Sequence, residues 1–534
     1  MVQRMSLTKA KTLLLAAASF LWPDCHAQYA WQHGAAAGEM LPFSDIHYEA
    51  ELQGSFSSGT TPLWLNANKH GLGSLERDNG YLRGALCRPL SADSARRWGL
   101  GYGVDAAVAS HYASRFIVQQ AYVEGRWLHG VLTIGAKEWP MELKNQRLSS
   151  GSQALGINAR PVPQVRIAVP EYWTIPALGR WFAVKVHVAY GLFTDQRWQR
   201  QFTNGGATPY NENVLYHSKA GYLRIGKPGE KPLAVELGLE MQAQFAGSKA
   251  ALSDGKLTRM KLGGKGIKDF WRVFIPSGSD ITDGLGYGNI EGNQSGAWLA
   301  RVSYDKPSWG VSVYADHYFE DHSQQFHLDF DGYGDGADYQ KRVSHRYLLY
   351  PLKDILLGGE LRLKRCQWLK GVVVEYLHTT YQSGPVYHDR TSTIPDHIGG
   401  RDNYYNHGNY MCVQHWGQVM GNPLYRSPAY NANHTLRVED NRFVAWHMGV
   451  EGTPVPRLGY RLLVSWQRGY GTYDEPYTYP HHNTSVLAEA EYGLDGERGL
   501  GDGQGLAARQ QPWLATDNMQ AWTLAIGKKR WERG

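Results

Sequence analysis

The sequence predicts an all-β chain folded as a transmembrane antiparallel outer-membrane β-barrel. Three observations predict it: segments in which apolar and polar residues alternate, aromatic residues at the ends of these segments, and long loops rich in Tyr, His, Asp, Asn and Gly. Lipid-facing and lumen-facing residues alternate along a barrel strand, and aromatic girdles flank the apolar band. A chain of this length suits about 16 to 18 strands with long loops.

The first 27 residues resemble a secretory signal peptide. Arg4, Lys9 and Lys11 precede the apolar run TLLLAAASFLW, and the small residue Ala27 follows it. This run is too short to cross a bilayer as a helix. No apolar run of 18 residues and no linker follows, so we expect residues 28–534 to form a single barrel domain with long loops.

Residues 181–193, WFAVKVHVAYGLF, show the strand pattern most clearly. Alternate positions from Phe182 to Leu192 are apolar, whereas the other face carries Lys185 and His187. Placing a lysine on the lipid side costs roughly 2–4 kcal/mol near the midplane of the bilayer. We therefore expect Lys185 and His187 to face the lumen.

A second clear strand is PLAVELGLEMQAQFAG. Apolar residues at alternate positions from Leu233 to Phe245 face out, and Glu236 and Glu240 face in. The same alternation appears in residues 297–304, 309–319, 371–381, 459–467 and 521–529. Aromatic residues expected at strand ends are Tyr102, Tyr222, Trp309, Tyr381, Tyr460 and Trp522. A soluble β-sandwich or propeller would also alternate, but the continuous aliphatic faces and the bulky, charged opposite faces favour a barrel.

Residues 267–275 break the strand pattern. Ile267, Phe270, Trp271, Phe274 and Ile275 follow the spacing of an amphipathic helix, and Pro276 ends it. We expect a short helix either at the periplasmic mouth or in the lumen.

Several chemistries find little support in the sequence. The net charge of +6 is too mild to predict nucleic-acid binding. Scattered histidines without an HExxH or CxxC motif give no zinc site, and the acidic loop 329–338 departs from the order of a calcium-binding EF-hand. Glu236 and Glu240 lie about 13 Å apart on one strand at ~3.3 Å per residue, too far for the usual glycosidase pair. We expect no metal, no cofactor and no catalytic residue.

The remaining pattern predicts a sugar-binding surface, because aromatic planes stack on sugar rings while charged and amide groups bond hydroxyls. Acidic polysaccharide would also be bound through the planar fork of arginine. Two regions have this composition, residues 160–173 and residues 387–418. The candidate binding residues, including two luminal glutamates, are Arg160, Arg166, Tyr172, Trp173, Lys185, His187, Glu236, Glu240, Tyr387, His388, Asp389, Arg401, Asp402, Tyr404, Tyr405 and Trp416.

Long stretches of the chain resemble the capsule assembly protein Wzi family. They include SSGSQALGINARPVPQVRIAVPEYW, VAYGLFTDQRW, VLYHSKAGYLRIG, YADHYFEDHSQQF, YLLYPLKDILLGGELRLKR and QHWGQVMGNPLYRSP, within a region running from about Tyr48 to the final strand. The resemblance implies an 18-stranded outer-membrane barrel with helical material at the periplasmic side. It also implies a lectin-like role in a Gram-negative bacterium, holding capsular or exported polysaccharide at the cell surface.

Three functions are therefore compared. The first is a non-enzymatic lectin that attaches capsular or exported polysaccharide, with outer-membrane lipid and the capsule export machinery as its other expected partners. The second is a sugar-permeable channel, which requires an open lumen. The third is a glycan-modifying enzyme, which requires two carboxylates about 5–10 Å apart.

Overall fold

The computed structural model describes residues 45–58, 61–94, 97–276, 278–282, 288–320, 332–333, 337, 341–343, 353–382, 401–496, 506–517 and 523–532. The predicted signal peptide lies outside these residues, as do the acidic residues of the 329–338 loop and the binding candidates Tyr387, His388 and Asp389.

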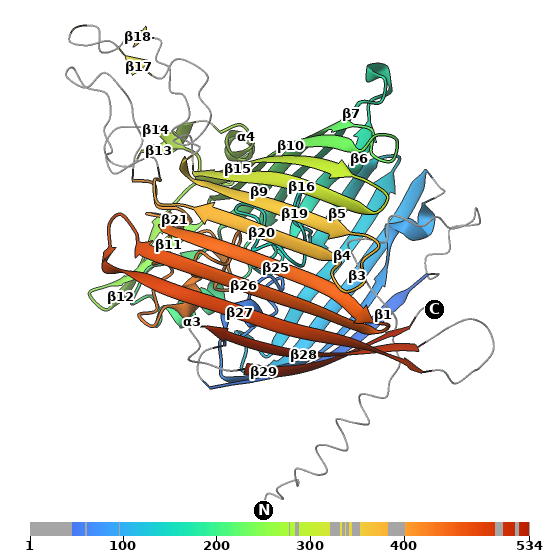
Figure 1. Cartoon of the computed structure of the whole chain (residues 1–534). Coiled ribbons are helices and arrows are strands. Elements are labelled where there is room, and N and C mark those ends of the chain that lie inside the picture. Colours follow the sequence, from blue (N-terminus) through green and yellow to red (C-terminus); the bar gives the residue numbers. More distant parts are fainter. Residues whose placement is uncertain are drawn as a thin grey trace, which may run out of the picture.

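An antiparallel sheet of 18 strands forms the body of the molecule (Figure 1). Its strands are β1 (His47–Ser57), β2 (Asp78–Arg88), β3 (Trp98–Ser110), β4 (Phe116–Trp127), β5 (Gly130–Ala136), β6 (Gln164–Thr174), β7 (Phe182–Leu192), β9 (Leu215–Gly226), β10 (Leu233–Phe245), β15 (Asn293–Asp305), β16 (Trp309–Glu320), β19 (Ile355–Leu363), β20 (Gly371–His378), β25 (Phe443–Val455), β26 (Leu458–Gly471), β27 (Pro476–Gly496), β28 (Leu506–Asp517) and β29 (Thr523–Glu532). Each pairs with its neighbours in this order, and β1 pairs with both β2 and β29. Hydrogen-bonded pairing therefore runs around the whole sheet, as the predicted barrel requires.

The long connections gather at one end of the barrel. Short turns, such as those between β4 and β5 and between β25 and β26, lie at the other end, where β1 begins and β29 ends. Outer-membrane barrels have short periplasmic turns and longer extracellular loops. The long-loop end is therefore the extracellular end.

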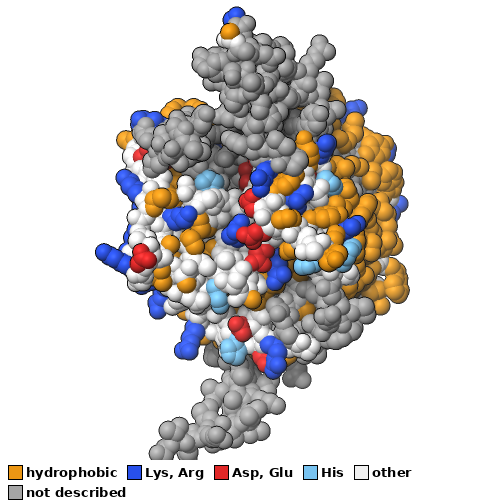
Figure 2. All heavy atoms as spheres, turned by 90° about the vertical axis from the view of Figure 1, so that its left-hand side faces the viewer, with side chains coloured by type: hydrophobic (Ala, Val, Ile, Leu, Met, Phe, Trp, Pro, Cys, Tyr) orange, Lys and Arg blue, Asp and Glu red, His pale blue; other side chains and the backbone are white. Residues whose placement is uncertain are grey.

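The outer face of the strands is apolar, as predicted. Ile167 of β6 is 65% exposed and Leu237 of β10 is 45% exposed, while the inward-facing His187 of β7 and Glu240 of β10 are buried. Hydrophobic side chains gather on one flank in Figure 2, beside the mainly polar end that carries the long loops. This apolar surface and the barrel fold place the protein in the outer membrane of a Gram-negative cell. None of the described helices is long and apolar enough to cross a membrane.

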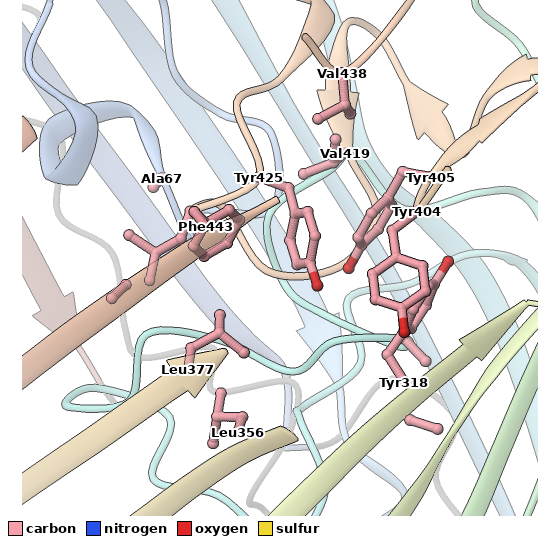
Figure 3. Packing of buried hydrophobic residues seen from close by; sticks show 14 of the residues in the cluster. Ala67, Tyr318, Leu356, Leu377, Tyr404, Tyr405, Val419, Tyr425, Val438 and Phe443 are labelled. Atoms are coloured by element: carbon pink, nitrogen blue, oxygen red, sulfur yellow. The ribbon is translucent and has the colours of Figure 1, made fainter. Parts of the chain in front are cut away.

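The interior of the barrel is packed with protein. The connections that enter it include the inner loop (residues 137–163, between β5 and β6), the cap loop (residues 401–442, before β25) and residues 61–77 between β1 and β2. A hydrophobic cluster forms where they meet the wall, and Figure 3 shows the rings of Tyr318, Tyr405 and Tyr425 gathered there. The Tyr318 and Tyr405 rings stack with centroids 5.1 Å apart. Aromatic packing of this kind holds the loops in one arrangement.

The predicted amphipathic helix is α4 (Ile267–Phe274), and its expected position is wrong. It lies at the long-loop rim, where the Tyr190 hydroxyl donates to the Phe270 carbonyl at 2.8 Å and the Phe245 and Phe270 rings meet at 5.2 Å. Tyr190 and Phe245 belong to the outward faces of β7 and β10. The helix therefore covers apolar side chains outside the barrel and lies neither in the lumen nor at the periplasmic mouth.

The remaining elements are short. They are the helices α2 (Leu63–Asn66) and α3 (Gln196–Phe202), the 3₁₀ turns η2 (Leu90–Asp93), η3 (Pro176–Leu178) and η6 (Pro428–Tyr430), a sheet of β8 (Tyr210–Glu212), β11 (Ser248–Ser253) and β12 (Lys256–Lys261), and two-stranded pairs of β13 (Gly278–Thr282) with β14 (Gly288–Ile290), β17 (Gly332–Tyr333) with β18 (Arg342–Val343), β21 (Asn406–His407) with β22 (Met411–Cys412) and β23 (Gln414–His415) with β24 (Gln418–Val419).

Candidate binding site

Carboxylates of the barrel wall hold the inner loop in place. Glu375 of β20 accepts hydrogen bonds from the Ser149 hydroxyl at 2.6 Å and from the Ser150 amide at 2.7 Å. Asp316 of β16 forms an ion pair with Lys144 at 2.5 Å and accepts from the Gln153 amide at 3.0 Å. Hydrogen bonds to charged groups are among the stronger ones in proteins. The loop is thus bonded to the wall through both its backbone and its side chains.

Two further wall carboxylates complete this set of anchors. Glu240 of β10 accepts from the Leu155 amide at 3.2 Å, and Glu360 of β19 accepts from the Asn145 amide group at 3.0 Å. Glu240 also accepts from Tyr222 at 2.7 Å. The prediction that Tyr222 belongs to the aromatic residues at the strand ends is therefore wrong, because its side chain faces the lumen and is buried.

The cap loop closes over the inner loop from the extracellular end. The Tyr405 hydroxyl donates to the Gln153 carbonyl, and the Tyr425 hydroxyl donates to the Gln153 side chain at 3.0 Å. Asn422 donates to the Ser150 hydroxyl at 3.1 Å and to the Gly151 carbonyl at 3.0 Å. The two loops form one bonded unit inside the barrel.

A cavity of about 590 Å³ remains between the inner loop and the wall formed by β6, β7, β9 and β10. This volume is in the range of ligand-binding pockets. The ionisable and aromatic side chains among its lining residues are His70, Lys137, Glu138, Trp139, Glu142, Arg160, Arg166, Glu171, Tyr172, Lys185, His187, Tyr216, Tyr222, Arg224 and Glu240.

Three arginines in this lining stack on aromatic rings. The guanidinium carbon of Arg166 lies 3.9 Å from the centre of the Trp139 ring, and that of Arg224 lies 4.3 Å from the centre of the Tyr172 ring. Arg160 is stacked in the same way on Trp416, at 4.4 Å. A stacked guanidinium keeps its N–H edge available for a planar acceptor such as a carboxylate.

These three guanidiniums lack carboxylate partners among the described residues. The Nε atoms of Arg160, Arg166 and Arg224 are buried without a hydrogen-bond acceptor. By contrast, other basic side chains of the interior form ion pairs, which join Arg83 to Asp105, Arg88 to Asp93, Lys137 to Glu124, Lys144 to Asp316, Lys185 to Glu142, Arg301 to Glu360 and Arg461 to Glu489. Buried polar groups are normally satisfied, and these three unpaired Nε atoms all belong to arginines that line the cavity.

Arg160 lies where the cavity meets the cap loop. It is 6% exposed, and burial lowers its pKa to about 10, against the opposing charge of Asp195. The Arg160 carbonyl accepts from Nδ1 of His415 at 2.9 Å, while Nε2 of His415 accepts from the Thr194 amide at 3.2 Å. These two bonds fix the neutral tautomer of His415 and hold the backbone of Arg160.

The structure brings six of the predicted binding residues together at the cavity: Arg160, Arg166, Tyr172, Lys185, His187 and Glu240. Trp416 joins them through its contact with Arg160. Lys185 and His187 face the lumen as predicted, and Lys185 is paired with Glu142 at 2.5 Å. Glu240 is occupied by its bonds to the inner loop, so it serves mainly as an anchor of that loop.

Other predicted residues lie elsewhere. Trp173 is 44% exposed on the outer face, because it alternates with the inward Tyr172 along β6. Tyr404 and Tyr405 are fully buried in the hydrophobic cluster and cannot contact a glycan. Arg401 forms a surface ion pair with Asp474 at 2.7 Å.

Two acidic candidates are also absent from the cavity. Asp402 bonds through its backbone amide to the Gln382 carbonyl at 3.0 Å. Glu236 lies opposite Arg224 in the β9–β10 register but does not line the cavity.

Sequence reasoning missed Trp139 and Arg224. Arg224 could have been found, because it occupies an inward position of the alternating strand LYHSKAGYLRIG. Trp139 belongs to no periodic segment, and only the inward path of the inner loop brings it to Arg166. Among the described residues, no group of three or more His, Cys, Asp or Glu side chains is arranged to hold a metal ion.

The fold is similar to that of solved outer-membrane barrels. Wzi of Escherichia coli, described as an outer-membrane protein involved in group 1 capsule assembly and a carbohydrate-binding β-barrel, matches with a TM-score of 0.51 at 13% identity, over 90% of this chain and 83% of Wzi. OprD of Pseudomonas aeruginosa matches with a TM-score of 0.40 at 8% identity, over 95% of this chain and 99% of OprD. No family model and no curated protein matches the sequence. The chain therefore has a Wzi-like outer-membrane β-barrel fold.

Proposed function

We propose that this chain is a member of the Wzi family that binds capsular or exported polysaccharide and attaches it at the cell surface without modifying it. The observation that carries the proposal is the cavity with its three arginine–aromatic stacks. Aromatic faces and unpaired guanidinium edges are suited to sugars that bear hydroxyl and acidic groups. The similarity to Wzi, a carbohydrate-binding barrel, supports the same class of ligand.

The packed lumen argues against a channel. Ser150 and Gln153 of the inner loop are buried and bonded to wall carboxylates, and Asn422 of the cap loop is bonded to the inner loop. A water-filled porin has a lumen free of such contacts. Diffusion of sugars would require both loops to leave the barrel.

An enzymatic role is also disfavoured. A glycosidase needs one carboxylic acid and one carboxylate placed on either side of the scissile bond. Glu240 is instead engaged by Tyr222 and by the Leu155 amide, and Glu142 is paired with Lys185. These groups are committed to holding the structure.

The test uses the full chain, purified in detergent, and the polysaccharide from the surface of its own cells. Binding is measured by equilibrium titration, while reducing ends are measured in the same samples. We expect saturable binding and no new reducing ends. Absence of binding would refute the proposal, and release of reducing ends would indicate a glycan-cleaving enzyme.

A further inference from the structure

We propose that the cavity between the inner loop and the β6–β10 wall binds an extended acidic oligosaccharide segment through the carboxylates of its sugar residues. This inference rests on the proposed function and specifies its ligand class and its site. The relevant observations are the three stacked guanidiniums, their buried Nε atoms, and their positions along the wall.

A buried guanidinium without a counter-ion is costly, since burying an unpaired charge carries a large desolvation penalty. The interior provides carboxylates for its other basic groups, as in the pairs of Lys137 with Glu124 and of Lys185 with Glu142. Arg160, Arg166 and Arg224 have none within ion-pair distance among the described residues. An anionic ligand would supply the missing charge.

Each guanidinium has its face against an aromatic ring, so its free edge presents parallel N–H donors. This fork matches the two oxygens of a carboxylate. Uronic acids and other carboxylate-bearing sugars carry such a group on a ring whose hydroxyls can bond further polar atoms of the lining.

Arg166 lies opposite Ala189 of β7, whereas Arg224 lies opposite Ala183 of the same strand. Six residues along a strand at ~3.3 Å each separate these levels by about 20 Å. Arg160 extends the row to the extracellular end, where its guanidinium contacts Ser114 at 3.4 Å. The row suits a chain with several acidic residues better than a single sugar.

The cavity also contains carboxylates, and three of the four are engaged by other groups of the protein. Glu142 is neutralised by Lys185, Glu138 accepts from Gln119 at 2.8 Å, and Glu240 accepts from Tyr222. Glu171 is exposed at the end nearest the short turns. The groups that remain free to bind an anion are the guanidiniums.

The experiment compares three ligand preparations by calorimetric titration of the full chain in detergent. Oligosaccharides from a partial digest of the cell's own surface polysaccharide are separated by anion exchange into acidic and neutral fractions. Part of the acidic fraction is then converted to the neutral alcohol by chemical reduction of its carboxyl groups. We expect the acidic fraction to bind at least tenfold more tightly than the reduced one, and longer acidic oligosaccharides to bind more tightly than monomers.

The variants are Arg166→Gln and Arg224→Gln, with Arg180→Gln as the matched control. Arg180 is an exposed arginine in the turn between β6 and β7, outside the cavity. We expect each cavity variant to weaken binding of the acidic fraction at least tenfold and the control to leave it unchanged. Heat-dependent mobility on gels verifies that each barrel is folded.

The outcomes separate the two proposals. Equal binding of the acidic and reduced fractions, or cavity variants that bind like the Arg180→Gln control, would overturn the acidic-site inference and leave the proposed function standing. Absence of binding by every fraction would overturn both. Inorganic phosphate is added as a competitor. If phosphate displaces the ligand while carboxyl reduction has no effect, the bound anion is a phosphate ester and the inference is wrong.

Discussion

Glu375 provides the sharpest test of the closed lumen. Its carboxylate is 1% exposed and accepts three hydrogen bonds: from the Ser149 hydroxyl at 2.6 Å, from the Ser150 amide at 2.7 Å and from the Tyr314 hydroxyl at 2.5 Å. The change Glu375→Ala removes both carboxylate oxygens and with them all three hydrogen bonds. We expect it to loosen the inner loop without dismantling the wall, because the backbone pairing of β20 with β19 and β25 is retained.

The expected magnitude follows from the number of bonds. A hydrogen bond to a charged group contributes about 1.5–3 kcal/mol, so three contribute roughly 4–9 kcal/mol at most. Rotation of the Tyr314 hydroxyl and entry of water reduce this value. Since 1.4 kcal/mol is a factor of ten in an equilibrium constant, even ~3 kcal/mol raises the population with a displaced loop more than a hundredfold. Glu375→Gln retains an acceptor and should have a smaller effect.

Single-channel recording in planar bilayers measures this population. We expect wild-type protein to be closed, Glu375→Gln to open rarely, and Glu375→Ala to open often. The control is Glu230→Ala, which removes an exposed carboxylate whose nearest charged partner is Lys227 at 3.9 Å. If folded Glu375→Ala protein opened no more often than this control, the anchoring role of Glu375 would be refuted.

Two further changes test the outer face and the inner electrostatics. Ile167→Arg places a charge on the lipid face, so the free energy of unfolding measured in denaturant titrations should fall by roughly 2–4 kcal/mol. The control Ile167→Val should change it little. An Arg variant as stable as the Val variant would contradict the assigned orientation of β6. Burial lowers the pKa of His415 below its usual 6.5, against the charge of Asp195. The contribution of neutral His415 to the free energy of unfolding is then fully present above about pH 6.5. It is lost as the pH falls towards and through the lower pKa of the folded state. Polysaccharide binding measured between pH 5 and 8 should therefore be flat at the alkaline end and decline on acidification, and His415→Asn should remove that decline; an unchanged decline in the variant would exclude His415 as its source.

Much of the wall could be predicted from the sequence because each strand carries its own signal. The alternation in residues 182–192 assigns Lys185 and His187 to the lumen, and burying one face makes a register slip costly. The alternation also carries information about Trp173, since Val165 and Ile167 share its parity and face the lipid. Composition alone predicts Trp173 at the binding surface, whereas its position in the strand places it on the outer face.

The interior could not be predicted in the same way. Tyr404 and Tyr405 have the composition of a sugar-binding loop, yet their burial depends on Gln153 and Asp354, which lie far away in the sequence. The position of α4 depends likewise on Tyr190 and Phe245, whose outward rings need a cover at the rim. Contacts of this range arise from the closed sheet and leave no local pattern in the chain.

Retention of polysaccharide on cells tests the central claim most directly. In cells that lack this chain, surface polysaccharide is measured in two fractions, cell-bound and released into the medium. We predict that total production is unchanged and that most of the polymer is released. Complementation with wild-type protein should restore the cell-bound fraction, and an Arg160→Gln/Arg166→Gln variant should restore far less. Full retention without the protein, or a loss of total production, would contradict the account.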